Sequence, residues 1–314
     1  WYSIRMGNSN KRSKMKKVML ISGGISAERE ISLISGKEVA KSLDRLGHKI
    51  IHVDANLNLL EKIEESKPDV IFNALHGTWG EDGQVQKILE LSKTAYTHSG
   101  IKASKIAMDK HESAKIFIKN DILYPSTILS SLNHLKDNLP FKFPFIIKPR
   151  SEGSSVGVSI IRKIEDIEDY ISRNIDRKEV LIQEFINGPE INVAVIGDNK
   201  TGSIEIDPKN EFYDYESKYF DDGGTKHIIP ARLSKDEIIQ VEKLALKVHN
   251  LIGCKGISRT EFIYDKHQSK FYILELNTQP GMTPTSLVPE IAKFHGISFD
   301  ELIDWILNDA STNR

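Results

Sequence analysis

The sequence predicts an α/β protein, α+β overall, whose first part is a parallel sheet with helices on its faces. Three short apolar segments, at residues 18–21, 49–54 and 69–75, are typical of buried strands, and helical segments lie between them. Strands that alternate with helices favour a parallel sheet. The second half is richer in strands and includes a hairpin over residues 257–277, so a different kind of sheet is expected there.

The first strand ends in a Gly-Gly loop at residues 23–24, and a helix follows it. Apolar residues recur in that helix near helical spacing: Ile31, Ile34, Val39 and Leu43. The second strand leads to a helix over residues 57–66, and the third leads to a glycine-rich turn over residues 76–80. Ligands bind at such strand ends in parallel sheets. The chain has no GxGxxG spacing, so the fingerprint of a dinucleotide site is absent.

From about residue 100 the pattern changes. A helix is expected over residues 104–119, and a glycine- and serine-rich loop over 150–157 lies between strands at 144–149 and 158–161. A further strand covers residues 179–185, residues 190–206 are strand-rich, and residues 211–229 are polar and loop-like. An amphipathic helix over residues 235–252 precedes the hairpin.

Composition excludes several classes of protein. The 314 residues suffice for two or three domains. A net charge of −1 provides no broad basic field, so neither nucleic acid nor an anionic membrane is an expected partner. No apolar run approaches the ~18 residues that cross a bilayer, and a cytoplasmic location is expected. The single cysteine, Cys254, excludes an intramolecular disulfide and is expected to be a small structural residue.

The last strand of the hairpin carries two oxygen-bearing side chains on one face. Glu275 and Asn277 are two residues apart, and alternate side chains of a strand share a face. Their neighbours are apolar, so these polar groups are costly to bury unless something binds them. Carboxylate and amide oxygens suit Mg²⁺, which commonly takes one or two carboxylates together with phosphate oxygens. The strand therefore predicts a metal–nucleotide site.

The facing strand of the hairpin extends this site. If Asp265 pairs with Phe271, Glu261 lies opposite Glu275, and Arg259 follows on the same face. Two carboxylates placed directly across a ladder repel each other unless a cation lies between them. A surface ladder of salt bridges with Arg259 is the alternative interpretation.

The glycine- and serine-rich loop is the second candidate element. Gly153, Ser154, Ser155 and Gly157 can direct backbone N–H groups toward a phosphate. Lys148, at the end of the preceding strand, adds a positive charge. The loop alone is equally compatible with a hairpin turn; together with Lys148 and the acidic hairpin it indicates a triphosphate site.

These motifs together resemble the D-alanine–D-alanine ligase family of the ATP-grasp superfamily. The matching segments, in order, are GGISAEREISL (23–33), HGTWGEDG (76–83), MDK (108–110), KPRSEGSSVG (148–157), FYDYESKY (212–219), CKG (254–256), ELNTQPGMT (275–283) and SLVP (286–289). Any one of them could occur by chance, whereas the ordered set is specific.

The resemblance implies a fold, an activity and partners. The fold is an N-terminal parallel αβα substrate domain (15–99) followed by a two-domain ATP-grasp fold, with a central subdomain (100–188) and a C-terminal subdomain (189–314) that carries a mobile loop and the metal site. Residues 1–14 are expected to be a disordered tail. The activity is ATP-dependent ligation of two D-alanines through an acyl phosphate, which supplies the dipeptide precursor of peptidoglycan and releases ADP and phosphate. A homodimer is implied by the family alone.

The resemblance also implies residue roles. Glu261, Glu275 and Asn277 match the ligands of two Mg²⁺ ions, for which Mn²⁺ can substitute. The residues that match ATP contacts are Lys110, Lys148, Ser155, Glu184, Phe185, Ile186, Glu190 and Lys218.

The amino-acid substrates have their own set of residues. Glu28 matches the residue that holds the ammonium of the first alanine, with Ser154 and Tyr219 in a relay beside it. Arg259 and the backbone N–H of Gly281 match the groups that stabilise the oxyanion of the tetrahedral intermediate. Among substrate-binding residues, Ser286 matches the group that binds the carboxylate of the second alanine, and His76 is also expected to contact substrate.

Single residues of this set have simpler alternatives. Glu28 near a helix N-terminus also suits capping, His76 suits a structural histidine, and Tyr219 suits an exposed tyrosine. The chain departs from the family at two positions, because Glu261 stands where Asp is usual and Gln183 where Glu is frequent. The alternative activities are a D-alanyl–D-lactate or other D-amino-acid ligase, and a nucleotide-binding regulator without catalysis.

Overall fold

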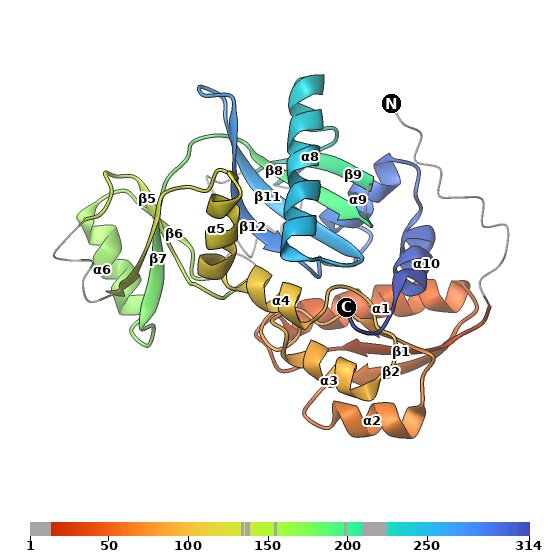
Figure 1. The fold of residues 1–314 in the computed structure, drawn as a ribbon. Helices are drawn as coiled ribbons and strands as arrows, with labels where there is room; N and C mark the ends of the chain where they lie inside the picture. Colours follow the sequence, from red (N-terminus) through yellow and green to blue (C-terminus); the bar gives the residue numbers. More distant parts are fainter. Residues whose placement is uncertain (1–13, 133–134, 136–138, 154–155, 198–199, 209–224) are drawn as a thin grey trace.

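A computed structural model describes residues 14–132, 135, 139–153, 156–197, 200–208 and 225–314. Three sheets organise these residues (Figure 1), and they follow one another along the chain. The expected tail falls almost entirely on residues 1–13, which lie outside the described residues.

The first sheet is parallel, as the alternation of strands and helices predicted. Its strand order is β2-β1-β3, from β1 (Lys17–Ser22), β2 (Lys49–Asp54) and β3 (Val70–Asn73). The helices α1 (Arg29–Arg45), α2 (Leu59–Ser66) and α3 (Gln84–Ser92) accompany it. Val39 and Leu43 of α1 are buried, because the apolar stripe of this helix faces the sheet.

The second sheet has four antiparallel strands in the order β4-β7-β5-β6. Their bounds are β4 (Thr127–Ser131), β5 (Phe145–Lys148), β6 (Ser159–Ile161) and β7 (Glu179–Glu184), and α6 (Ile164–Arg173) packs against them (Figure 1).

The third sheet has five antiparallel strands in the order β10-β9-β8-β11-β12. Their bounds are β8 (Glu190–Ile196), β9 (Lys200–Asp207), β10 (Lys226–Ile228), β11 (Ile257–Asp265) and β12 (Lys270–Asn277). The predicted amphipathic helix is α8 (Lys235–Ile252), which covers one face of this sheet (Figure 1). Strand β10 lies within the stretch predicted to be loop-like, so that prediction was wrong at residues 226–228.

The single helix expected over residues 104–119 is two helices, α4 (Ile101–Met108) and α5 (Lys110–Lys119). The break is at Asp109, whose extended backbone and carboxylate cap the N-terminus of α5 by accepting from the backbone N–H groups of His111 and Glu112. Arg150 binds the same carboxylate at 2.8–3.0 Å and holds it in place. The apolar residues of both helices pack with α8, on the third sheet.

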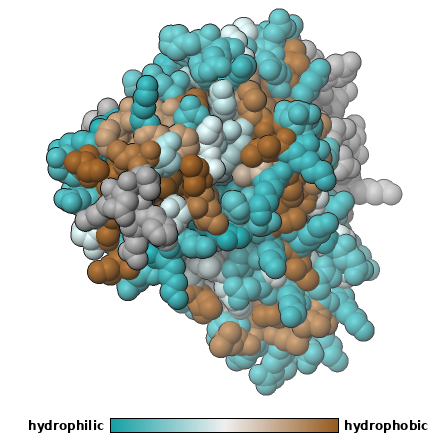
Figure 2. Space-filling view, turned by 60° about the vertical axis from the view of Figure 1, so that its left-hand side comes forward, coloured by the Kyte–Doolittle hydropathy of each residue, from teal (hydrophilic) through white to brown (hydrophobic). Residues whose placement is uncertain are grey.

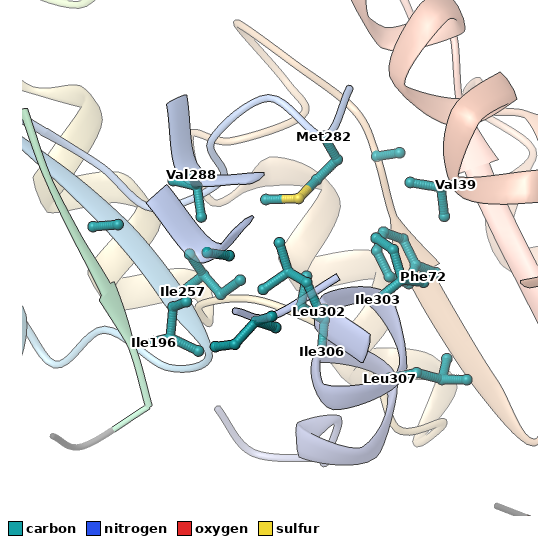
Figure 3. Packing of buried hydrophobic residues seen from close by; sticks show 14 of the residues in the cluster. Val39, Phe72, Ile196, Ile257, Met282, Val288, Leu302, Ile303, Ile306 and Leu307 are labelled. Atoms are coloured by element: carbon teal, nitrogen blue, oxygen red, sulfur yellow. The ribbon is translucent and has the colours of Figure 1, made fainter. Parts of the chain in front are cut away.

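Two C-terminal helices, α9 (Leu287–Phe294) and α10 (Phe299–Asp309), join the third sheet to the first. Their side chains form one core with residues of α1, β3, β8 and β11 (Figure 3). Met282, from the loop after β12, lies within this core beside Leu302 and Val288 (Figure 3). The loop that follows the predicted metal-binding strand is therefore held against the first sheet.

Hydrophobic and hydrophilic residues alternate in small groups on the face shown in Figure 2. Among the described residues, none of the helices has the length and apolar character of a membrane span.

Cys254 is buried, as expected for a structural residue, and burial raises the pKa of its thiol to about 12.

Candidate functional site

A cavity of about 400 Å³ lies between the second and third sheets. Six residues predicted to contact ATP line it: Lys110, Lys148, Glu184, Phe185, Ile186 and Glu190. The other two, Ser155 and Lys218, lie outside the described residues. The segment after β7 supplies apolar and backbone surface on one side of the cavity, while the lysines and Glu261 and Glu275 supply charge on the other.

The two lysines of this cavity differ in their charge partners. Burial disfavours the charge of Lys110, but an ion pair at 3.1 Å with Glu275 more than offsets it and raises the pKa of this lysine. Lys148 donates instead to the neutral Oε1 of Gln183 at 2.8 Å. Burial, and then repulsion by Lys110, lowers the pKa of Lys148 to about 7. Among the described residues Lys148 has no directly bound carboxylate, so an anionic ligand would favour the charged form of this buried lysine.

Two acidic residues and one amide form a row across three neighbouring strands. Asn192 of β8 pairs with Glu261 of β11, and Glu261 pairs with Glu275 of β12. Directly paired residues share a face, so all three side chains project from the same side of the sheet. The pairing of Glu261 with Glu275 and of Arg259 with Asn277 agrees with the register expected from the sequence.

The far end of the same hairpin differs from the expected register. Asp265 pairs with Lys270 and not with Phe271, because the ladder shifts between Glu261 and Phe262. Phe262 pairs with Ile273, so the shift leaves Leu274 as the extra residue of a β-bulge. Leu274 and Glu275 consequently line the same cavity, although they are adjacent in sequence. The bulge thus turns Glu275 toward the cavity.

The donor set of this row suits a hard cation. The Oε2 atom of Glu261 is buried, has no hydrogen-bond partner within the part of the chain that the structure describes, and lies 3.8 Å from Nη2 of Arg259. The Oδ1 atom of Asn277 accepts from the backbone N–H of Gln279 at 2.7 Å and retains a second lone pair. The described residues contain no cluster of three or more His, Cys, Asp or Glu. A metal here would therefore need amide and phosphate oxygens besides the two carboxylates, which is the chemistry of Mg²⁺.

A second cavity, of about 190 Å³, adjoins the first at Glu261. Three residues predicted for the amino-acid substrates line it: Arg259, Gly281 and Ser286. Ser286 precedes the first turn of α9, where the helix dipole favours an anion. Its Oγ makes no cap to the helix and bonds instead to Thr283, 3.1 Å from the backbone N–H and 2.8 Å from Oγ1.

Glu28 lies at the start of α1, and it is buried. Its side chain makes no capping hydrogen bond, so the capping alternative is not supported. A Cβ atom built on Gly77 would lie 2.5 Å from Oε2 of Glu28, and one built on Gly153 would lie 3.2 Å away. The carboxylate therefore meets two glycine-containing loops, one from the first sheet and one from the second. Ser154 and Tyr219, its predicted partners, lie outside the described residues.

His76 lies behind the two cavities and lines neither of them. Its Nε2 atom is 3.1 Å from Oγ of Ser35, and the ring also bonds to the backbone of Gln279. Burial, and then the charge of Arg259, lowers the pKa of His76 to about 4. The ring is thus neutral and joins α1 to the loop after β12.

Three buried polar residues near the cavities were not predicted from the sequence: Glu81, Asn192 and Gln279. The Oε1 atom of Glu81 accepts from the backbone N–H of Gly77 at 2.6 Å, and burial, then the charge of Glu28, raises the pKa of Glu81 well above its usual value. Asn192 alternates with the apolar residues of β8, which is the signal that marked Glu275 and Asn277. Nothing in the sequence distinguishes Gln279 from its neighbours.

Comparisons with known proteins agree across most of the chain. Family models described as D-ala D-ala ligase N-terminus and D-ala D-ala ligase C-terminus match residues 53–99 and 127–308. A D-alanine–D-alanine ligase of Pelagibacter ubique (strain HTCC1062) is 50% identical, with 95% of this chain and 99% of that protein covered. One from Rickettsia bellii (strain OSU 85-389) is 44% identical, with 94% and 92% covered.

Solved structures give the same result. A D-alanine–D-alanine ligase of Bacillus anthracis is 31% identical and superposes with a TM-score of 0.81, covering 94% of this chain and 97% of that chain. Another structure of that enzyme, complexed with ATP, has a TM-score of 0.78 at 29% identity, with the same coverage. The VanG D-Ala:D-Ser ligase of Enterococcus faecalis has a TM-score of 0.77 at 26% identity, covering 94% and 99%.

Proposed function

The chain belongs to the D-alanine–D-alanine ligase family, and from that premise we propose that it joins two D-alanines at the expense of ATP. The observation that carries the proposal is the junction of two cavities at Glu261. The larger cavity has the lysines and carboxylates that a nucleotide triphosphate requires. The smaller cavity has the cation of Arg259, the backbone turn at Gly281 and the N-terminus of α9 at Ser286. These groups suit a carboxylate and the tetrahedral adduct that forms from it. A phosphoryl group at the junction would face the amino-acid substrate.

ATP would lie in the larger cavity, with its base against the segment after β7 and its phosphates toward Lys110 and Lys148. Ser155 would contact the phosphates, and the segment containing Lys218 would close on them, as the family resemblance implies. Phosphoryl transfer requires mainly positioning and neutralisation of charge. Lys148 suits this role because its charge is poorly compensated until an anion binds.

The residues that would hold two Mg²⁺ or Mn²⁺ ions are Glu261, Glu275 and Asn277. Bound there, the ions would neutralise the β- and γ-phosphate oxygens. The row of side chains across β11 and β12 supports this assignment because Glu261 and Glu275 pair directly and both line the larger cavity. Lys110, which pairs with Glu275, keeps that carboxylate directed into the cavity.

The first D-alanine would place its ammonium on Glu28 and receive the γ-phosphate on its carboxylate. The amine of the second D-alanine would then attack the acyl phosphate, and phosphate would leave from the tetrahedral intermediate. Arg259 and the backbone N–H of Gly281 would stabilise the oxyanion. Ser286 at the start of α9 would bind the carboxylate of the second substrate, and His76 would hold the loop that carries Gly281.

Ser154 and Tyr219 would complete a relay with Glu28; for these two residues the family resemblance is the only support. The same resemblance supports a cytoplasmic homodimer and a division into domains at residues 99 and 188. We include these as parts of the proposal.

The test is coupled ADP release with purified protein, Mg²⁺ and ATP, across D-alanine, D-serine, D-lactate and L-alanine. We expect turnover when D-alanine is the sole amino acid, and no turnover with L-alanine. More depsipeptide than dipeptide in the presence of D-lactate would favour the D-alanyl–D-lactate alternative. ATP binding without ADP release at millimolar D-alanine would favour a regulator that has lost catalysis.

The assay also tests D-serine as the second substrate, because one similar structure is named a D-Ala:D-Ser ligase. D-Serine should serve less well than D-alanine as the second substrate. Mass spectrometry of the products separates the two dipeptides. A mixed dipeptide as the main product would assign the chain to the D-serine class.

A further inference from the structure

Asn192 occupies the end of the row that Glu261 and Glu275 form across the third sheet. It pairs directly with Glu261, and its side chain shares the face of the two carboxylates. The residue is 0% exposed, yet it lines the smaller cavity together with Arg259 and Glu261. Asn192 therefore projects toward the junction of the two cavities, where the phosphoryl group would lie.

One atom of this buried amide has no partner. The Oδ1 atom of Asn192 makes no hydrogen bond with any described residue. The Nδ2 atom donates to Oε1 of Glu190 at 2.8 Å, which fixes the orientation of the amide, because the reversed orientation would place two oxygens against each other. A buried amide oxygen without a donor is destabilising. The free lone pairs thus face a site that must supply a cation or a donor.

Glu261 beside it also presents a buried oxygen, Oε2, that has no hydrogen-bond partner among the residues described. The two orphan oxygens come from residues that pair directly on adjacent strands. Both are hard oxygen donors of the kind that Mg²⁺ and Mn²⁺ prefer. No carboxylate pair alone satisfies such an ion, and a neutral amide adds a ligand without adding repulsion.

We propose that Asn192 is a further oxygen donor to the divalent cation held by Glu261, either directly or through a water bound to that ion. The inference rests on the proposed metal site and extends it to β8. It also gives a reason for the unpartnered oxygen of Glu261 among the described residues. Glu261 lies on β11, between the strands of Asn192 and Glu275, and would share the ion with the amide of Asn192. Asn192 is then part of the metal site, and the substrates do not contact it.

The test is the dissociation constant of Mn²⁺ in the presence of ADP, measured from the electron paramagnetic resonance of free Mn²⁺. The Asn192→Leu variant keeps the volume and removes the oxygen, and we expect its affinity for Mn²⁺ to fall about tenfold or more. The Asn192→Asp variant keeps an oxygen in place. It should bind Mn²⁺ at least as tightly as the unaltered protein and should gain more thermal stability on adding Mn²⁺, because the ion relieves repulsion from Glu190 and Glu261.

Thr260 supplies the matched control. It is the neighbour of Glu261 on β11 and is 0% exposed, and its side-chain oxygen has no hydrogen-bond partner in the described ranges, but it points to the opposite face of the sheet. Thr260→Val should leave Mn²⁺ affinity unchanged. Equal Mn²⁺ affinity in Asn192→Leu and Thr260→Val would overturn the inference, as would an Asn192→Leu variant altered only in its KM for D-alanine.

The reference variant Glu275→Gln separates this inference from the proposed function. If the unaltered protein and Glu275→Gln bind Mn²⁺ equally, the proposed metal site itself is wrong. If Glu275→Gln loses Mn²⁺ and Asn192→Leu retains it, only the role of Asn192 is refuted. Thermal unfolding of each variant shows that it is folded under the conditions of the titration.

Discussion

Asn73 and Gln279 join two parts of the chain that are 206 residues apart, by a buried hydrogen bond of 2.7 Å from Asn73 Nδ2 to Gln279 Oε1. Gln279 also donates from Nε2 to the backbone carbonyl of Leu75, and its own backbone bonds to His76. These contacts hold the end of β3 against the loop after β12. The loop begins directly after Asn277 and contains Gly281, so the first sheet sets the position of these residues of the proposed site relative to Glu28.

Replacing Gln279 by Met should therefore lower both stability and turnover. The substitution leaves the amide of Asn73 and the carbonyl of Leu75 without their partner, which costs about 1–3 kcal/mol for each buried group. We expect a lower free energy of unfolding in urea and a lower kcat for ADP release. The double variant with Asn73→Ala should cost less than the sum of the single variants, because both remove the same hydrogen bond. Additive costs would show that the two residues act separately.

Lys148 binds the neutral side chain of Gln183, and this predicts that nucleotide binding is coupled to proton uptake. At pH 8 a lysine with a pKa of about 7 is mostly neutral in the free protein. Bound phosphates favour its charged form, so nucleotide binding at pH 8 should take up nearly one proton, and affinity should fall as the pH rises above 7. Calorimetry of ADP binding in buffers of different ionisation enthalpy measures this uptake.

Gln183→Glu is the control for that prediction. It gives Lys148 a carboxylate partner at the position of the present 2.8 Å hydrogen bond, which should raise the pKa of the lysine. Proton uptake at pH 8 should then nearly disappear while nucleotide still binds. Unchanged uptake in Gln183→Glu would mean that another group takes the proton.

Glu275→Gln should nearly abolish turnover and destabilise the protein slightly. The sequence identified this carboxylate, but its ion pair with the buried Lys110 is visible only in the structure. The amide keeps the shape and loses the charge, so we expect a cost of about 1–3 kcal/mol in urea denaturation. Glu112→Gln, which alters an exposed pair with Lys115, should leave the stability almost unchanged. Normal ADP release by Glu275→Gln would contradict the assignment.

Local pattern predicted the elements that build the site, and it did so best where alternation was strict. The pairing of Glu261 with Glu275 was predicted from an assumed pair of Asp265 with Phe271. That pair is absent, and the bulge offsets the difference, so that Glu261 still pairs with Glu275. The bulge at Leu274 could not be predicted, because Leu274 is as apolar as Ile273 and Leu276. Its contact with the cavity is visible only in the structure. The break at Asp109 was missed because its cause, Arg150, comes from a distant loop.

Contacts between sheets were beyond the reach of sequence patterns. Gln279 and Asn192 are ordinary polar residues until the partner strands are known, and the function of each depends on an atom far away in sequence. The packing of α9 and α10 onto the first sheet is a further case, since their apolar stripes fit many partners. Family resemblance supplied what pattern could not, namely the roles of Glu28 and Ser286.

Two buried histidines predict how stability depends on pH. Burial is the main cause that lowers the pKa of His98 to about 3 and that of His76 to about 4, from 6.5 in each case. The unfolded chain therefore binds more protons than the folded protein between pH 6.5 and about 4. The stability that these histidines contribute is present above pH 6.5 and is lost as the pH falls below it, by a few kcal/mol in all.

His98 separates this effect from general acid denaturation. The described residues give its ring at most a weak contact with the backbone of Asn73, and its φ of 69° is one that asparagine also tolerates. His98→Asn should therefore flatten the loss of stability between pH 6.5 and 4 in urea denaturation at a series of pH values. The exposed histidine variant His267→Asn should follow the unaltered protein. An unchanged slope in His98→Asn would show that protonation of other groups governs acid unfolding.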